Sequence, residues 1–182
     1  MVRSIIICKE QLSKKKWTAY GMQAHRFETA EEKMIIETWS PEETFALGKM
    51  IGEKAKAGQI YTLEGDLGVG KTVFTQGVAA GLEITEAISS PTFTLVQIYE
   101  DGRLPFYHFD VYRIGDIEEM EEIGYDDYFF GNGICLIEWA NLITEILPEN
   151  LIEIAIEKDL EKGFDYRRIC INGLEERLEL KK

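Results

Sequence analysis

The sequence predicts an α/β fold with a mostly parallel sheet, flanking helices and one antiparallel hairpin. A glycine-rich loop at 65–70 stands between a strand candidate and a helix candidate, the order found in phosphate-binding loops. The run 134–137 is continuously apolar, as expected for a strand that a sheet buries on both faces. Asp101-Gly102 joins two β-rich runs and is a strong hairpin signal. Together these features indicate a P-loop NTPase-like fold.

The elements follow from local signals along the chain. Ser40 is a good N-cap, and Pro41 and Glu43 suit the first and third helical positions, so a helix begins there and should end near Gly58. The acidic segment 116–122 also looks helical. The expected helices are 41–58, 72–80 and 116–122, and the expected strands are 34–38, 59–63, 92–99, 104–110, 133–138, 151–156 and 166–171.

The chain has the size and the apolar content of one domain. It has 182 residues, of which 45% are apolar and 11% aromatic. The first 33 residues differ from the rest, because they hold seven basic and four acidic residues in an otherwise acidic chain. We therefore expect residues 1–33 to be an N-terminal extension outside the core and residues 34–182 to form the domain. A pair of N-terminal strands with little part in the chemistry is the alternative.

The composition argues against several classes of protein. No apolar run of eighteen residues exists, so we expect no membrane span and a cytoplasmic protein. The three cysteines are widely spaced and odd in number, which disfavours a zinc site or a disulfide framework. The formal net charge of −13 disfavours unaided binding to nucleic acid and favours a partner with a basic face.

The segment 65–72, Gly-Asp-Leu-Gly-Val-Gly-Lys-Thr, has the spacing of a Walker A phosphate-binding loop. Glycines let the backbone N–H groups surround a phosphate chain, and the helix that follows points its positive end at the same phosphates. Lys71 should reach the β and γ phosphates, and the Thr72 hydroxyl should bind Mg²⁺. The expected cofactors are therefore a nucleotide and Mg²⁺.

Two carboxylates stand where strands are expected to end. Asp110 follows the run 105–109, and Glu138 follows the run 134–137. Mg²⁺ prefers hard oxygen ligands, and ligands of open α/β sheets bind at the carboxyl edge of the strands. Both residues are thus candidates for metal binding and catalysis. The sequence leaves open which one touches the metal and which one orients the attacking water.

Other residues near these motifs have structural alternatives. Thr92 and Thr94 alternate along an expected strand, and either hydroxyl could face the γ-phosphate as in nucleotide switches, although β-propensity alone would explain them. Trp139 could pack on adenine or cap the core. His108 and Arg113 are expected to be structural.

Four motifs in this order and spacing resemble the TsaE (YjeE) family of bacterial P-loop ATPases, over roughly residues 34–155. They are the glycine loop 65–72, Ser-Pro-Thr-Phe-Thr-Leu-Val at 90–96, His-Phe-Asp-Val-Tyr-Arg at 108–113 and Ile-Glu-Trp at 137–139. The sequence departs from the family pattern at Val69, Val73 and Ala140, which are small changes in side-chain volume. The basic N-terminal extension is not part of that pattern, and the resemblance implies no function for it.

The resemblance implies weak ATP hydrolysis in isolation and association with the TsaD and TsaB proteins. The ATPase cycle would support threonylcarbamoyl transfer to the adenosine beside the anticodon of tRNAs that read ANN codons, with tRNA reached only through the complex. It implies catalytic roles for Lys71, Asp110 and Glu138 and metal binding by Thr72, Asp110 and Glu138. The implied nucleotide contacts are Asp66, Leu67, Gly68, Val69, Gly70, Lys71, Thr72, Val73, Thr92 and Trp139.

Three other functions use the same loop. A GTPase normally selects its base with an N-K-x-D motif, which this sequence lacks, so ATP is the favoured nucleotide. A small-molecule kinase usually brings several arginines over the nucleotide, whereas only Arg103 and Arg113 lie between Lys71 and Glu149. The third is a protein-interaction switch gated by nucleotide, in which turnover is incidental.

Overall fold

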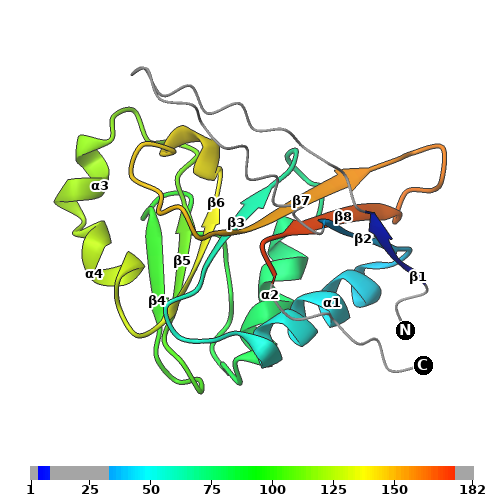
Figure 1. Ribbon diagram of the computed structural model, residues 1–182, viewed down its shortest axis with the longest axis horizontal. Helices are drawn as coiled ribbons and strands as arrows, with labels where there is room; N and C mark the ends of the chain where they lie inside the picture. Colours follow the sequence, from blue (N-terminus) through cyan, green and yellow to red (C-terminus); the bar gives the residue numbers. More distant parts are fainter. Residues whose placement is uncertain (1–3, 9–32, 175–182) are drawn as a thin grey trace, which may run out of the picture.

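The described residues form one sheet with helices packed against it (Figure 1). The computed structural model describes residues 4–8 and 33–174, and its eight strands follow the order β1-β2-β8-β7-β3-β6-β5-β4. The strands are β1 Ser4–Cys8, β2 Lys33–Thr38, β3 Ile60–Glu64, β4 Val96–Tyr99, β5 Phe106–Asp110, β6 Ile134–Glu138, β7 Ile152–Lys158 and β8 Arg167–Asn172. The helices are α1 Pro41–Lys54, α2 Lys71–Gly81, α3 Glu118–Glu122, α4 Tyr125–Phe129 and the short 3₁₀ helix η1 Ala140–Leu142.

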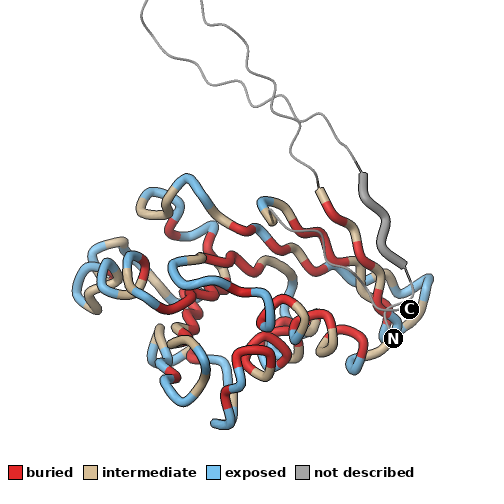
Figure 2. The backbone as a smooth tube through the Cα atoms, turned by 60° about the horizontal axis from the view of Figure 1, so that its bottom comes forward, coloured by how far each residue is buried: buried red, intermediate tan, exposed pale blue. Residues whose placement is uncertain are grey.

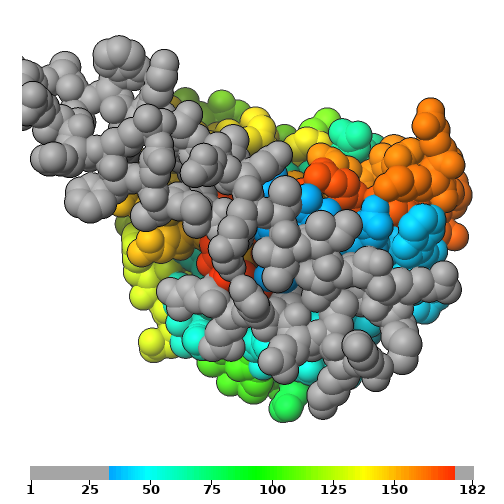
Figure 3. All heavy atoms as spheres, turned by 45° about the vertical axis from the view of Figure 1, so that its right-hand side comes forward, coloured from blue at the N-terminus to red at the C-terminus, as the bar shows by residue number. Residues whose placement is uncertain are grey.

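The centre of the sheet is parallel and its flanks are antiparallel. Strands β7, β3, β6 and β5 run parallel to one another. Strand β4 pairs antiparallel with β5, as the hairpin signal predicts, and β8, β2 and β1 continue the other side antiparallel. The space-filling view shows β2 (blue) beside β8 (red), although their residues lie far apart in the sequence (Figure 3). The predicted α/β class is confirmed, with a mixed sheet.

Alternation along the central strands sends side chains into two apolar clusters. Phe106 and Leu136 join the cluster that includes α1 and α2, whereas Phe109 and Ile137 join the cluster that includes α3, α4 and η1. Buried positions concentrate along the central strands and the inner sides of the helices, and exposed positions lie on the loops (Figure 2). The sheet is therefore covered on both faces around β5 and β6.

Glycines bring α1 and α2 into close contact. A Cβ atom at Gly48 would lie 2.3 Å from the carbonyl oxygen of Phe74, and one at Gly77 would lie 2.2 Å from that of Phe45. Neither position can accept a side chain without a shift of one helix. The packing fixes α2, and with it the glycine loop that precedes α2, against the rest of the core.

Several boundaries differ from the sequence-based expectations. Helix α1 ends at Lys54, and Gly58 lies in the turn beyond it with φ +80°. The helix expected at 116–122 is shorter, and α4 after it was not predicted. The strand expected from Thr92 begins only at Val96.

Part of the N-terminal extension lies in the sheet. Ser4–Cys8 pairs antiparallel with β2 at the edge, whereas residues 1–3, 9–32 and 175–182 lie outside the described residues. The division of the chain after residue 33 stays a prediction. In the part of the chain that the structure describes, no helix has the length and apolar character needed to cross a membrane.

The two described cysteine thiols are buried. Cys135 and Cys170 are both unpaired, and burial raises the pKa of Cys135 to about 12. A thiol with so high a pKa remains protonated near neutral pH and is a poor nucleophile. Within residues 4–8 and 33–174, no group of three or more His, Cys, Asp or Glu side chains is arranged to hold a metal ion.

Candidate functional site

The glycine loop connects the end of β3 to the first residue of α2. Gly65 has φ +145° and Gly70 has φ +106°, values that favour glycine, and a Cβ atom at Gly65 would lie 2.5 Å from the carbonyl oxygen of Ile156. Gly70 caps α2, and its carbonyl oxygen accepts the first helical hydrogen bond from the Phe74 N–H at 3.1 Å. The N–H groups of the first turn of α2 therefore face the loop without helical partners.

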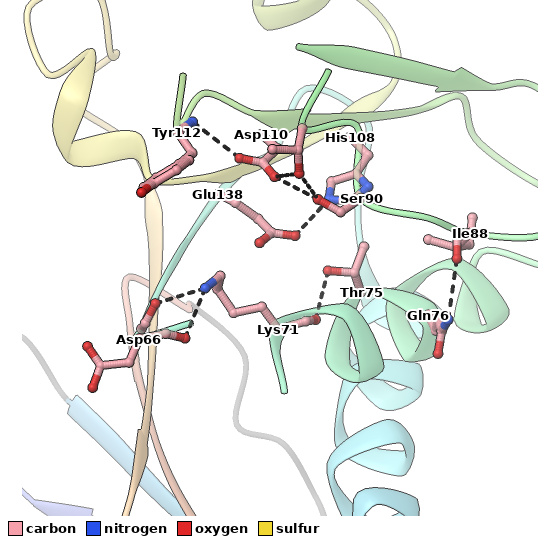
Figure 4. A network of polar contacts seen from close by, with 12 residues as sticks. Asp66, Lys71, Thr75, Gln76, Ile88, Ser90, His108, Asp110, Tyr112 and Glu138 are labelled. Atoms are coloured by element: carbon pink, nitrogen blue, oxygen red, sulfur yellow. Dashed lines mark hydrogen bonds and ion pairs between the residues drawn. The ribbon is translucent and has the colours of Figure 1, made fainter. Parts of the chain in front are cut away.

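The Lys71 ammonium group lies inside this loop. Its Nζ atom donates to the carbonyl oxygens of Gly65 at 2.8 Å and Asp66 at 3.2 Å (Figure 4). The same atom lies 4.7 Å from the centre of the Trp139 ring. Lys71 is only 7% exposed, so the positive charge is held in a partly enclosed place.

The two predicted carboxylates are neighbours in the sheet. Asp110 and Glu138 end adjacent parallel strands and are paired in register, and they are 4% and 3% exposed. Their side chains lie on the same face as Lys71 (Figure 4). The parallel pairing of β5 with β6 thus brings together two carboxylates that are 28 residues apart in the sequence.

The two carboxylates have different hydrogen-bond partners. Oδ2 of Asp110 accepts from the hydroxyls of Ser90 and Thr92, each at 2.6 Å, and Oδ1 accepts from the Tyr112 N–H at 3.2 Å. Oε1 of Glu138 lies 3.0 Å from Nε2 of His108. Asp110 is therefore hydrogen-bonded to the segment before β4, whereas Glu138 contacts His108, a buried residue on β5.

The expected strand at 92–95 is instead a turn, so the prediction that Thr92 and Thr94 share a strand face is wrong. The Thr94 N–H donates to the Pro91 carbonyl oxygen at 3.0 Å, and Leu95 has φ +62°. Serine and threonine hydroxyls can form hydrogen bonds that compete with the regular pairing of strands. Here the Thr92 hydroxyl donates to the Asp110 carboxylate. Thr94 is exposed and contributes no hydrogen bond to Asp110.

These residues surround a cavity of about 460 Å³. It is lined by Leu67, Gly68, Gly70, Lys71, Thr72, Val73, Ser90, Thr92, Asp110, Tyr112, Glu138 and Trp139. Of the residues predicted to contact nucleotide, Asp66 and Val69 are absent from the lining: Asp66 supplies a carbonyl oxygen to Lys71, and Val69 is buried beneath the loop. A second cavity, of about 540 Å³, is lined by Glu64 and Glu153 among others, but it contains no part of the glycine loop.

Trp139 lies at the lysine end of the cavity. It has φ +62°, which is unusual for a large side chain, and its ring is 5.0 Å from the ring of Tyr112. Contact with the Lys71 ammonium places the indole where phosphates are expected, and the backbone strain is typical of functional sites. Trp139 is also partly buried against the cluster that includes α3, α4 and η1, as expected for a residue that caps the core. Its contact with Lys71 was not predicted.

Two residues of the site were not recognised from the sequence. The Arg167 guanidinium, on β8, donates from Nε to the carbonyl oxygen of Val69 and so holds the glycine loop from outside. His108 was expected to be structural, yet it contacts Glu138. The sequence contained a clue to the position of His108, because a residue two positions before Asp110 on a strand faces the same side of the sheet.

Arg113 lies over the Phe93 ring at 4.5 Å.

A glycine loop between β3 and α2, with two buried carboxylates at the ends of adjacent strands, defines an α/β protein with a P-loop NTPase-like fold. Residues 38–169 match the family model described as threonylcarbamoyl adenosine biosynthesis protein TsaE. The chain belongs to the TsaE family, whose role is in the biosynthesis of threonylcarbamoyladenosine in tRNA. The predicted family resemblance is thereby confirmed.

Similar proteins share most of the domain. The tRNA threonylcarbamoyladenosine biosynthesis protein TsaE of Bacillus subtilis is 50% identical over 143 residues, which are 79% of this chain and 87% of that protein. The protein of the same name from Treponema pallidum is 41% identical over 117 residues, 64% of this chain and 86% of its own length. The crystal structure of YdiB from Bacillus subtilis superposes with a TM-score of 0.68 at 43% identity and covers 82% of this chain and 88% of that one.

Proposed function

We propose that the chain binds ATP with Mg²⁺ in the 460 Å³ cavity and hydrolyses it in support of threonylcarbamoyl modification of tRNA. The observation that carries this proposal is the meeting of Lys71, Thr72, Asp110 and Glu138 around one cavity at the start of α2. These four side chains supply the cation, the hydroxyl and the carboxylates that phosphate transfer to water requires. We propose that the protein carries out this role in the cytoplasm.

The loop and Lys71 would hold the phosphates. Free N–H groups at the start of an eleven-residue helix attract anions, and the glycine conformations allow the backbone to approach closely. An ammonium group has three donors, and in Lys71 two of them are engaged by the carbonyl oxygens of Gly65 and Asp66. Lys71 is thus already positioned beside the loop and retains a donor for phosphate.

The residues present fit a magnesium ion that takes part of its coordination from nucleotide and water. Mg²⁺ prefers oxygen ligands, and proteins usually bind it through one or two carboxylates together with substrate phosphates. Thr72, Asp110 and Glu138 supply such oxygens in one cavity, while a dedicated cluster of three acidic or imidazole ligands is missing from residues 4–8 and 33–174. The ion would neutralise phosphate charge when bound.

The hydrogen-bond partners suggest a division of labour between the carboxylates. Asp110 already accepts from three donors, which leaves it less capacity for a water molecule. The Glu138 carboxylate is bonded to His108 alone among the described residues. We therefore assign Glu138 to orient the attacking water and Asp110 to serve the metal side of the site.

The turn at 91–95 favours a second function, a nucleotide-gated switch for a protein partner. The hydroxyl of Thr92 in the turn and that of Ser90 just before it both donate to Asp110, so a nucleotide and ion that compete for Asp110 would change how the turn is held. Phe93, at the tip of the turn, is 84% exposed.

Because the net charge of −13 opposes direct tRNA binding, we propose that tRNA is reached through TsaD and TsaB.

A small-molecule kinase is less well supported by the cavity. The Arg103 guanidinium donates to the carbonyl oxygens of Gly52 and, at 2.8 Å, Ala55, at the end of α1. Arg113 lies on Phe93. No arginine lines the cavity among the described residues, so the positive lid that kinases place over transferred phosphate has no counterpart there.

Reconstitution tests the proposal. ATP hydrolysis and the amount of threonylcarbamoyladenosine formed per TsaD molecule would be measured for the chain alone, with TsaB and TsaD, and with both plus tRNA. The parent should hydrolyse ATP and raise the number of modification turnovers. Glu138→Gln should still bind ATP but retain only a small residual hydrolysis rate, and it should not raise the number of turnovers. Turnovers supported equally well by Glu138→Gln would favour the switch. An absence of ATP binding would contradict both functions.

A further inference from the structure

We propose that His108 is a positioning residue that fixes the orientation of the Glu138 carboxylate. This inference rests on the proposed function, because it concerns the group that would orient the attacking water. His108 does not line the cavity. It would act only through Glu138.

The geometry places His108 directly behind the carboxylate. His108 lies two residues before Asp110 on β5, and Asp110 is paired with Glu138 on β6, so all three side chains face the same side of the sheet. The His108 ring is fully buried, and its Nε2 atom is 3.0 Å from Oε1 of Glu138 (Figure 4). Within residues 4–8 and 33–174, this is the one hydrogen bond to the Glu138 carboxylate.

The second ring nitrogen indicates where the proton lies. Nδ1 of His108 is buried and has no hydrogen-bond partner among the described residues. A proton on Nδ1 would leave a buried donor unsatisfied and would turn an acceptor toward the carboxylate, and both are unfavourable. The ring therefore carries its proton on Nε2, where it donates to Glu138.

The ring itself is held in place by packing. The ring of Phe106 is stacked 5.9 Å from that of His108, with 6° between their planes. A glutamate side chain has three rotatable bonds, so a single fixed donor at Oε1 limits how the carboxylate can turn. Since Glu138 lines the cavity, its second oxygen is left to face the reacting groups. Support of this kind commonly decides whether a catalytic carboxylate is productive.

Two amide variants provide a matched test. His108→Gln places an N–H donor near the position of Nε2, whereas His108→Asn is one methylene shorter and cannot reach Oε1. Both variants bury an amide group at the same position, so any loss of stability from a buried amide should be shared by both. We expect His108→Asn to lower kcat about 10-fold or more while the KM for ATP changes little, and His108→Gln to restore kcat to within about 3-fold of the parent.

A double variant shows whether the effect passes through Glu138. If it does, His108→Asn should not lower the residual kcat of Glu138→Gln any further. If the two residues act independently, the double variant should show both effects, with the changes in activation free energy adding. Equal kcat values for parent and His108→Asn, or additive losses in the double variant, would overturn the positioning role. A parent that neither binds nor hydrolyses ATP would instead overturn the proposed function.

Discussion

The Lys71 ammonium group lies 4.7 Å from the centre of the Trp139 indole and also bonds to two carbonyl oxygens of the glycine loop. The residue that should meet the phosphates is therefore held by an aromatic face as well as by the backbone. An interaction of this kind contributes roughly 1 kcal/mol or more when partly buried. Trp139 thus reports on the state of Lys71.

The contact predicts a fluorescence signal on nucleotide binding. Phosphates that draw the ammonium group away should change the emission of Trp139, measured in a Trp17→Phe, Trp39→Phe background so that one indole remains. The change should saturate at the same ATP concentration as the heat of binding. It should disappear in Lys71→Met. A full signal in Lys71→Met would mean that Trp139 senses something other than the lysine.

The turn at 91–95 predicts a difference between two threonines. Thr92→Val keeps the shape of the side chain but removes the hydroxyl that bonds Asp110 at 2.6 Å. ATP turnover should fall about 10-fold to 100-fold, as for the loss of one hydrogen bond to a charged group. Thr94→Val, in the same turn and exposed, is the control and should turn over ATP like the parent. Equal rates for the two variants would refute a role of the hydroxyl.

Arg167 predicts an effect on nucleotide affinity from outside the cavity. It donates to the Val69 carbonyl oxygen in the glycine loop, whereas the neighbouring Arg168 pairs with Glu157 at 2.9 Å on the surface. Arg167→Met should weaken Mg-ATP binding about 2-fold to 10-fold, because the loop loses the hydrogen bond at Val69 that holds its shape. Arg168→Met should leave affinity unchanged. Calorimetric titration of both variants separates loop support from a general loss of positive charge.

The hydrogen bonds of Glu37 predict that the folded protein loses stability at acidic pH. The Tyr166 hydroxyl at 2.6 Å and the Lys162 ammonium at 3.0 Å hold the pKa of Glu37 below its ordinary value of 4.5. A depressed carboxyl pKa contributes stability that is present above 4.5 and is lost as the pH falls through the lower folded-state value. Glu37→Gln should therefore lower the unfolding midpoint at pH 7. The difference between the two proteins should shrink as the pH falls below 4.5 and vanish below the folded-state pKa of Glu37. A constant difference at all pH values would contradict this origin.

The loop and the sheet could be predicted because their signals are local. The spacing of glycines before Lys71 defines the turn into α2, and Asp101-Gly102 defines the hairpin of β4 and β5. Asp110 and Glu138 were expected at strand ends, and parallel pairing places them side by side. Their assignment to the site needed only the rule that ligands bind at the carboxyl edge of such a sheet.

What was missed depends on contacts distant in the sequence. At Thr92 the chain turns and the side-chain hydroxyl bonds Asp110, 18 residues later, and β-propensity contains no information on such a bond. Arg167 reaches a loop 98 residues earlier, which no periodicity reveals. The contact of Trp139 with Lys71 depends on a backbone conformation, φ +62°, that large side chains rarely adopt.

Calorimetric titration with Mg-ATP tests the central claim, that the cavity beside α2 holds the phosphates of ATP. The parent and a surface control, Lys49→Ala on α1, should bind one ATP with equal affinity, because Lys49 is half exposed and does not line the cavity. Lys71→Ala should bind about 100-fold more weakly or not at all, since the phosphates lose their charged donor. Undiminished binding by Lys71→Ala, or no heat of binding with the parent, would contradict the claim.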